Sequence, residues 1–203
     1  MLDHNGREVQ QSSEREAELV RALARRSEQA MAEIYSLHGG LVYRFTLRMV
    51  HDEAVAEELT QDVFLALLRQ SEKFDPTVGK LSTWLCGIAR RLVWKHLERN
   101  RRLEPLDSSD ASALESPDGD PAVLYDSQQL VLAVRAGIDE LPTDLKAVLV
   151  LCEFEEMSYE EAAAALDVPI GTVRSRLHRA KHRLALLLRD EKLNSDSPTR
   201  RNG

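Results

Sequence analysis

A basic block near the C-terminus carries the residue types that bind nucleic acid. Six Lys and Arg side chains lie between residues 174 and 189, and no Asp or Glu occurs from 168 to 189. A helix that is merely solvated usually mixes both signs of charge, because opposite charges four residues apart stabilise it. Arg also has the planar donor geometry that matches phosphates and guanine edges. The block therefore favours DNA contact, with a solvated basic helix on a bundle as the alternative.

Two helices joined by a sharp turn are predicted to position this block. Ser158 and Glu161 have the spacing of a capping box, which places a helix start directly after Ser158. Residues 167–169 interrupt the pattern with a proline that suits the first turn of a new helix. Apolar residues then recur at three- and four-residue spacings over 170–187, which predicts one buried stripe. This is the layout of a helix-turn-helix that reads the major groove of duplex DNA. The candidate contacts are Thr172, Arg174, Ser175, His178, Arg179 and His182.

A second basic stretch, residues 90–102, contains six Lys and Arg side chains and one acid. On a helical wheel, Trp94 lies between Arg90 and Arg101 on the face away from the apolar stripe, with Arg91 nearby. Aromatic rings among cations hold unstacked bases, at about 1–3 kcal/mol per base. We therefore predict a single-strand or backbone contact here. The alternative is that Trp94 packs on a neighbouring helix, on a linker or on a protein partner.

The net charge of −7 is an average over blocks of opposite sign. Residues 52–62 and 104–120 are acidic without any Lys or Arg, and residues 139–161 hold eight acids and one Lys. Screening limits the reach of charges to about 10 Å, so a phosphate backbone responds to the local patch. The pattern indicates two nucleic-acid contacts and separate acidic surfaces for a protein partner.

Composition excludes several other classes of protein. Aromatic residues are few and Leu, Ala, Glu and Arg are abundant, which favours an all-α protein. No apolar run approaches 18 residues and the N-terminus has no signal-peptide core, so we expect a cytoplasmic protein without membrane insertion. The two cysteines, Cys86 and Cys152, are interpreted as small core residues. No catalytic motif, metal-ligand cluster or cofactor motif is recognisable, so no catalytic residue, metal or cofactor is predicted.

The chain is expected to form two small helical domains joined by a flexible acidic linker, with the helix-turn-helix in the second domain. Residues 103–121 are rich in Ser, Asp and Pro without periodicity, as linkers are. The first domain is expected over 14–102 and the second over 122–190. Residues 1–13 and 191–203 are expected to be flexible tails.

Hydrophobic periodicity predicts the helices of the first domain. A break is expected near Ser27, and Gly39-Gly40 is expected to end the first helix. The predicted helices cover about 14–37, 41–50, 52–70 and 82–100, and in the second domain about 122–138, 142–156 and the two motif helices. The predicted inward residues of the third and fourth helices are Val55, Leu59, Val63, Leu67 and Leu68, then Leu85, Ile88, Ala89, Leu92 and His96.

Three segments in order along the chain carry a resemblance to a known family. They are residues 52–64 (DEAVAEELTQDVF), residues 74–90 (FDPTVGKLSTWLCGIAR), and residues 157–163 (MSYEEAA) with 168–180 (VPIGTVRSRLHRA). Together they make the chain resemble a bacterial RNA polymerase sigma factor of the extracytoplasmic-function (ECF) type, in the sigma-70 family. In order, they resemble the family's polymerase-gripping helix, the loop and helix that open and read the −10 element, and the domain that reads the −35 element.

The resemblance implies roles for individual residues. The helix-turn-helix face would meet the −35 major groove. The −10 candidates are Lys80, Ser82, Thr83 and Trp84, joined by Arg90, Arg91 and Trp94 from the basic stretch. The core polymerase candidates are Glu58, Leu59, Gln61, Asp62 and Phe64. The resemblance also implies core RNA polymerase, promoter DNA and an anti-sigma factor as partners, and a specificity subunit without catalysis of its own.

A stand-alone helix-turn-helix regulator with an N-terminal sensory or dimerisation domain is the main alternative. It would bind duplex DNA without polymerase. An enzyme is a more distant alternative.

Overall fold

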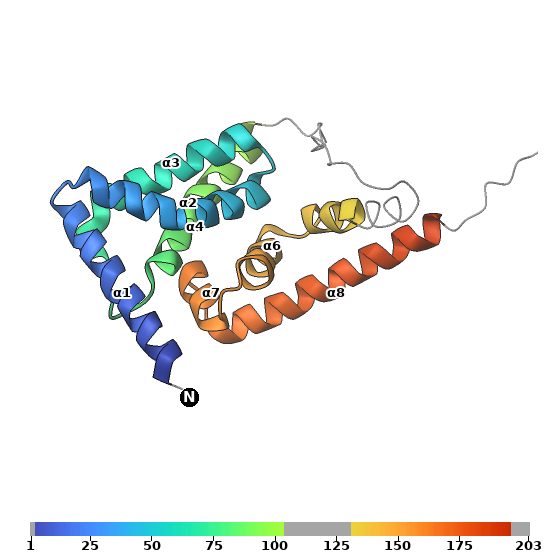
Figure 1. Ribbon diagram of the computed structural model, residues 1–203. Coiled ribbons are helices and arrows are strands. Elements are labelled where there is room, and N and C mark those ends of the chain that lie inside the picture. Colours follow the sequence, from blue (N-terminus) through green and yellow to red (C-terminus); the bar gives the residue numbers. More distant parts are fainter. Residues whose placement is uncertain (1–2, 104–130, 196–203) are drawn as a thin grey trace, which may run out of the picture.

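The computed structural model describes residues 3–103 and 131–195, which form helices joined by short turns and loops, with no strand among them. The all-α prediction is thus confirmed for the described part of the chain (Figure 1). The N-terminal domain comprises α1 (Asp3–Ala24), α2 (Glu28–Val50), α3 (Glu53–Gln70), the short η1 (Ser71–Lys73) and α4 (Leu81–Leu103). The C-terminal domain comprises a helical stretch at 131–139, α6 (Thr143–Leu149), the π-helical η2 (Val150–Phe154), α7 (Tyr159–Leu166) and α8 (Ile170–Ser195).

Side-chain caps begin the central helices of the N-terminal domain where the sequence offers them. Ser27 accepts a hydrogen bond from the Ala30 amide at 3.3 Å at the start of α2, which confirms the predicted break. Asp52 does the same for the Val55 amide at 2.9 Å at the start of α3. Each cap satisfies a backbone donor that the first helical turn leaves free. The hairpin of α2 and α3 then buries one apolar face against α4.

Two predicted boundaries in this domain were wrong. Gly39-Gly40 does not end a helix, because α2 runs from Glu28 to Val50 without interruption. Burial of Ile34 and Val42 on one face outweighs the helix cost of about 1 kcal/mol per glycine. The chain also becomes helical at Asp3 rather than near residue 14, since adding residues to an existing helix costs far less than starting one.

The predicted inward faces of α3 and α4 are largely correct. Leu59, Val63 and Leu67 are buried. Leu68, however, is exposed, because it lies about 100° around the helix from Leu67. On α4, Leu85, Ile88 and Ala89 are buried, while Leu92 and His96 are only partly covered.

The C-terminal domain packs α6, η2 and α7 beside the long α8. Val173, Leu177 and Ala180 of α8 are buried, and Leu184 and Leu187 are partly buried, as the stripe predicts; Ile170 is more exposed than expected. The expected helix at 142–156 forms, but it changes to a π-helix at Val150. α8 continues to Ser195, beyond the expected domain end at 190.

The two domains are in contact in this structure. α4 of the first domain packs along α7 of the second (Figure 1). The predicted linker lies outside the described residues from residue 104 to its end.

Candidate nucleic-acid interface

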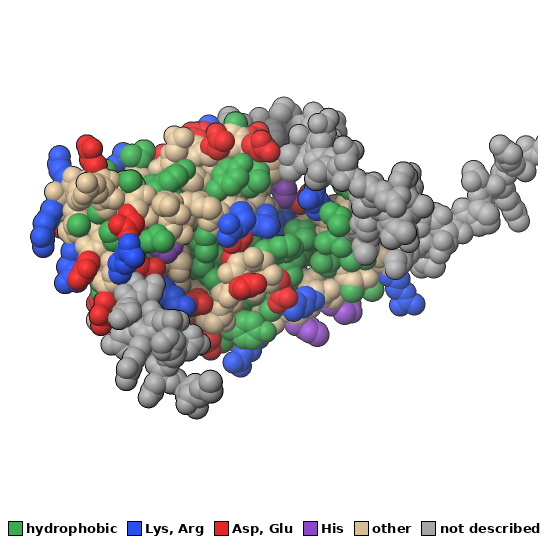
Figure 2. Space-filling model, in the orientation of Figure 1, with side chains coloured by type: hydrophobic (Ala, Val, Ile, Leu, Met, Phe, Trp, Pro, Cys, Tyr) green, Lys and Arg blue, Asp and Glu red, His purple; other side chains and the backbone are tan. Residues whose placement is uncertain are grey.

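The predicted DNA-reading face of α8 is open to solvent. Arg174, Ser175, His178, Arg179 and His182 are all exposed, and Thr172 is half-exposed. Figure 2 shows basic and His side chains following one another along the outer edge of this helix. The structure therefore brings these six residues together on one surface, as the periodicity predicts.

A rigid turn sets the direction of this helix. The Ser158 hydroxyl accepts from the Glu161 amide at 3.1 Å, and the Glu161 carboxylate accepts from the Ser158 amide at 2.9 Å, which completes the predicted capping box. Asp167 ends α7 in the left-handed conformation with φ 54°. The Pro169 carbonyl then accepts from the Thr172 amide at 2.8 Å and starts α8.

Two cations on the flank of α8 are paired with acids, whereas the cations of its exposed face are not. Arg176 pairs with Asp144 at 2.7 Å. Lys181 pairs with Glu153 at 2.7 Å, and the hydrogen bond to Glu153 raises the pKa of Lys181. Within the described residues, Arg174 and Arg179 have no acidic partner. The structure thus separates structural cations from cations available to a ligand.

The second candidate surface, at the start of α4, is much less open. Lys80 is exposed, but its ammonium group contacts the Glu161 carboxylate of α7 at 2.6 Å. Thr83 is buried, and its hydroxyl has no hydrogen-bond partner among the described residues. Trp84 is half-buried, with its ring centroid 5.6 Å from that of Phe74. Ser82 is also half-buried.

Further along α4, the candidates divide between surface and core. Arg91 is exposed, while Arg90 is partly buried, with its Nε inaccessible and without a hydrogen bond in the described part of the chain. Trp94 is partly buried and packs against the hydrophobic core, which is the alternative considered for it above.

The polymerase candidates on α3 also divide into two groups. Glu58, Gln61 and Asp62 are exposed on one side of the helix. Leu59 and Phe64 are buried, and the Phe64 ring lies 4.8 Å from the ring of Tyr35. Those two side chains belong to the core and support the exposed three from beneath.

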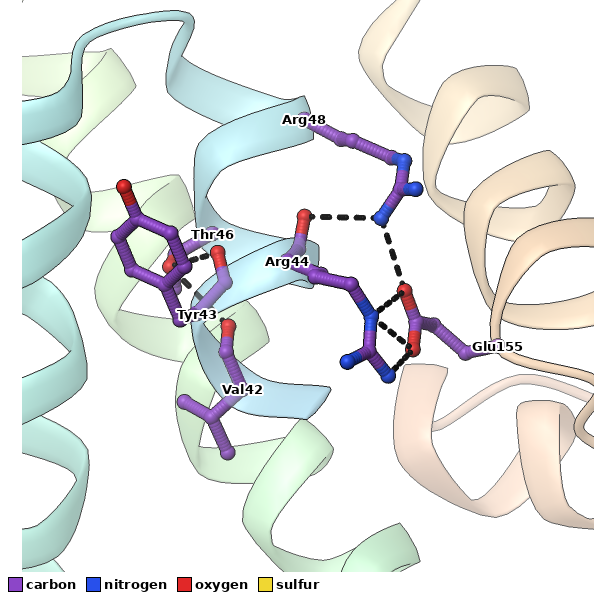
Figure 3. A network of polar contacts seen from close by, with 6 residues as sticks. All are labelled: Val42, Tyr43, Arg44, Thr46, Arg48 and Glu155. Atoms are coloured by element: carbon purple, nitrogen blue, oxygen red, sulfur yellow. Dashed lines mark hydrogen bonds and ion pairs between the residues drawn. The ribbon is translucent and has the colours of Figure 1, made fainter. Parts of the chain in front are cut away.

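A cluster that the sequence did not indicate joins the two domains. The carboxylate of Glu155 is completely buried and accepts from Arg44 Nη2 at 2.6 Å and from Arg48 Nη1 at 2.9 Å (Figure 3). The hydrogen bond to Glu155 raises the pKa of Arg44. Arg48 also lies over the Phe154 ring, 4.8 Å from its centroid. These residues are more than 100 positions apart in sequence, so no local pattern could have related them.

Neither the two cysteines nor a cluster of metal-binding side chains provides a second candidate site among the described residues. Burial raises the pKa of Cys86 to about 12 and that of Cys152 to about 11, so both remain thiols at neutral pH. Across residues 3–103 and 131–195, no His, Cys, Asp or Glu cluster has the arrangement of a metal site. The same residues contain no helix both long and apolar enough to span a bilayer.

Family models match both domains. Residues 34–103 match Sigma-70 region 2, and residues 132–184 match Sigma-70, region 4. The chain is 34% identical over 154 residues to the ECF RNA polymerase sigma factor SigE of Mycolicibacterium smegmatis, covering 75% of this chain and 59% of SigE. It is 31% identical over 169 residues to the ECF RNA polymerase sigma factor RpoE of Cereibacter sphaeroides, covering 82% of this chain and 91% of RpoE.

Solved structures share the fold. CnrH in complex with the cytosolic domain of CnrY superposes with a TM-score of 0.63 at 22% identity, covering 90% of this chain and 99% of CnrH. RpoE from Bartonella quintana, in complex with the anti-sigma factor NepR, gives a TM-score of 0.61 at 22% identity, covering 78% of this chain and 96% of RpoE. With both regions matched in order and the helix-turn-helix built as expected, the chain belongs to the sigma-70 family of RNA polymerase sigma factors, in the ECF group.

Proposed function

We propose that this sigma factor directs core RNA polymerase to promoters by reading a −35 element with α8 and a −10 element with the start of α4. The exposed face of α8 carries the proposal, because Arg174 and Arg179 have no acidic partner among the described residues, while the neighbouring Arg176 and Lys181 do. Arg in the major groove discriminates guanine by about 1–3 kcal/mol per bidentate pair. Residues 14–102 would act as the polymerase and −10 domain, and residues 122–190 as the −35 domain.

The −10 element would be read as melted single strand. Extruding a base costs a few kcal/mol, which stacking and a basic channel can offset. Lys80, Trp84 and Arg91 present polar or aromatic groups at or near the surface, and Ser82 and Arg90 are partly accessible. Thr83 and Trp94 contribute through packing unless the domain rearranges.

Core polymerase would bind the acidic surface of α3 through Glu58, Gln61 and Asp62, which are exposed together. Leu59 and Phe64 would shape that surface from the core. The chain would supply promoter specificity without catalysis of its own, and would act in the cytoplasm, where polymerase and promoters meet.

An anti-sigma factor would control the protein. The basis is similarity: a solved sigma factor of the same fold is bound to an anti-sigma factor, NepR. Acidic and apolar surfaces on α3 and α2, including the exposed Tyr35 and Leu65, would be available to such a partner.

Run-off transcription with purified core polymerase tests the proposal. Addition of the chain is expected to produce promoter-specific transcripts from templates of its own genome, and the chain is expected to co-purify with core polymerase. Duplex-specific binding without polymerase, combined with no transcripts on any template, would instead support a stand-alone regulator.

A further inference from the structure

A carboxylate of α1 is buried against the helix proposed to read the −10 element. The side chain of Glu16 is only 18% exposed. Its Oε2 accepts a hydrogen bond at 3.4 Å from the backbone amide of Leu81, the first residue of α4. Its Oε1 lies 3.3 Å from Nε2 of His38 on α2. Glu16 therefore connects three helices, α1, α2 and the start of α4.

The contact with His38 restricts how the Glu16 side chain can lie. His38 is 8% exposed, and its Nε2 has no well-aligned hydrogen bond within the described residues. At 3.3 Å, Glu16 is at ion-pair distance from this nitrogen, and it is the acid with which the described chain pairs His38. With Oε1 directed to His38, the second oxygen of Glu16 is directed to Leu81.

The start of α4 provides a favourable place for this carboxylate. The first amides of a helix lack partners within the helix and carry partial positive charge. The first turn of α4 contains no acidic residue. Lys80, directly before the helix, has no side-chain acceptor that could serve as a cap. Glu16 of α1 therefore supplies from a distant part of the chain the cap that the local sequence lacks.

The loop at 74–80 that leads into α4 is in contact with α1 at both ends. α1 packs on η1, which directly precedes the loop, and Glu16 contacts the residue that directly follows it (Figure 1). Inside the loop, Asp75 accepts from the Thr77 amide at 2.9 Å and from the Thr77 hydroxyl at 2.6 Å. The rings of Phe74 and Trp84 also meet across it. The loop and the first turn of α4 are thus held as one unit.

Stability alone does not account for a carboxylate at this position. Apolar groups of similar size often replace buried ionic groups without loss of stability, but a buried ionic contact is satisfied in only one geometry. The geometry fixed here includes Trp84, which lies three residues after Leu81 on the first turn of α4. Moreover, α1 ends at Ala24, outside the residues 34–103 that match Sigma-70 region 2, so the family match assigns no role to Glu16.

We propose that Glu16 is a positioning residue for −10 recognition, which fixes the first turn of α4 and the loop at 74–80 so that Trp84 is presented to the melted strand in one orientation. This inference rests on the proposed function and deepens it. Stacking of a base depends on the direction of the ring that receives it. Glu16 itself would not contact DNA. Without its carboxylate, Trp84 would remain in the chain but would distinguish bases less well.

Open-complex formation by the holoenzyme tests this role. Permanganate footprinting compares a promoter identified by run-off transcription with a copy that carries one substitution in the −10 element, and the ratio of the two yields measures −10 discrimination. Glu16→Ala is expected to lower this ratio by roughly fivefold, the scale of a lost helix cap. Glu16→Gln keeps the shape and an acceptor oxygen, so a smaller fall is expected. Affinities for core polymerase and for a −35 duplex should not change in either variant.

Glu18→Ala is the matched control. It makes the same change on the same helix, and Glu18 is exposed and forms no ion pair within the described residues. Hydrogen exchange of the full chain, followed by mass spectrometry, adds a direct readout of the cap. The peptide that contains Leu81 should exchange faster in Glu16→Ala than in the wild type, and at the wild-type rate in Glu18→Ala.

The outcomes separate this inference from the proposed function. A wild-type holoenzyme that discriminates at −10, together with a Glu16→Ala variant that discriminates equally well, would overturn the positioning role alone. Equal losses in Glu16→Ala and Glu18→Ala would assign the effect to the charge of α1 and overturn it too. Loss of core and −35 binding along with −10 discrimination in both Glu16 variants would show a folding role instead. A wild-type holoenzyme that opens both templates equally would overturn the proposed −10 reading itself, whatever the variants do.

Discussion

The two basic helices of this protein look alike in sequence but differ in the structure. Arg174 and Arg179 of α8 are exposed to solvent. On α4, by contrast, Arg90 is partly buried, and Lys80, directly before the helix, forms an ion pair with Glu161. The difference arises from the helices that pack against each of the two. α8 meets its own domain along one stripe, while α4 is packed by α2 and α3 on one side and by α7 on another. A basic helix thus leaves its cations available only where no second domain covers it.

Among single substitutions, one on the exposed face of α8 should have the largest effect on promoter binding. Arg179→Ala is expected to weaken −35 binding by the holoenzyme by roughly 10-fold to 100-fold, since a bidentate Arg contact is worth about 1–3 kcal/mol. Electrophoretic mobility shift with a −35 duplex measures it. Arg183→Ala, on the flank of the same exposed helix, is the control and should cost far less. Equal losses would mean that α8 binds phosphates without reading bases.

The covered helix should contribute only after polymerase has bound. Trp84→Ala is expected to reduce open-complex formation by roughly tenfold, because stacking on an aromatic ring is worth about 1–3 kcal/mol per base. Permanganate footprinting of the −10 segment measures it. Trp84→Phe keeps a ring against Phe74 and should retain most of the activity, which separates stacking from loss of packing. Reduced binding of the −35 duplex by Trp84→Ala would contradict this assignment.

A substitution on α3 should affect neither DNA contact. Gln61→Ala is expected to weaken core polymerase binding by a few-fold, since one net hydrogen bond contributes about 0.5–1.5 kcal/mol. Surface plasmon resonance with immobilised core polymerase measures it, and −35 duplex binding by the pre-formed holoenzyme is the control. Loss of DNA contact with unchanged core affinity would reverse the residue assignment.

Acid should weaken the contact between the two domains, which covers α4 and leaves the basic face of α8 open. His51 Nε2 lies 2.9 Å from Lys146 Nζ and 3.1 Å from Asp139 Oδ1, so it can accept from Lys146 only when neutral. Burial, and then the charge of Lys146, lowers the pKa of His51 despite the opposing effect of Asp139. The contact between the two domains therefore binds a proton less readily than separated domains would, and it is favoured above about pH 6.5.

Lowering the pH from about 7.5 to about 5.5 should consequently raise affinity of the free chain for a −10 oligonucleotide by a few-fold. Fluorescence anisotropy measures it. His51→Asn is the matched control, because Asn tolerates the left-handed backbone found at His51, where φ is 59°, and does not titrate. A pH response of equal size in this variant would assign the effect to other groups.

Much of the fold could be predicted because its signals are local. The Ser158 and Glu161 capping box, the Asp167 to Pro169 break and the α8 stripe act within a few residues, and each formed as expected apart from the exposed Ile170. The failures occurred where tertiary packing outweighed a local preference. Gly39-Gly40 remained helical because buried neighbours on both sides hold α2 together.

For the candidate site, too, the features set by local sequence were predicted and those set by tertiary packing were not. The exposed basic face of α8 followed from periodicity, because a helix that buries one stripe must expose the opposite one. Leu59 and Phe64 were placed with the polymerase-binding residues, yet they are core residues, since a motif does not distinguish the side chain that contacts a partner from the one that supports it.

The sequence by itself determined the helices, the helix-turn-helix and the sigma-70 resemblance, since caps, breaks and apolar stripes are properties of residues close along the chain. Only the tertiary structure decided which cations are available. Arg44 and Arg48 share Glu155, and Lys80 is paired with Glu161, both acids coming from the other domain. Charge pairing acts over a few ångströms in space and has no fixed spacing in sequence, so the masking of α4 became visible only once the two domains were placed together.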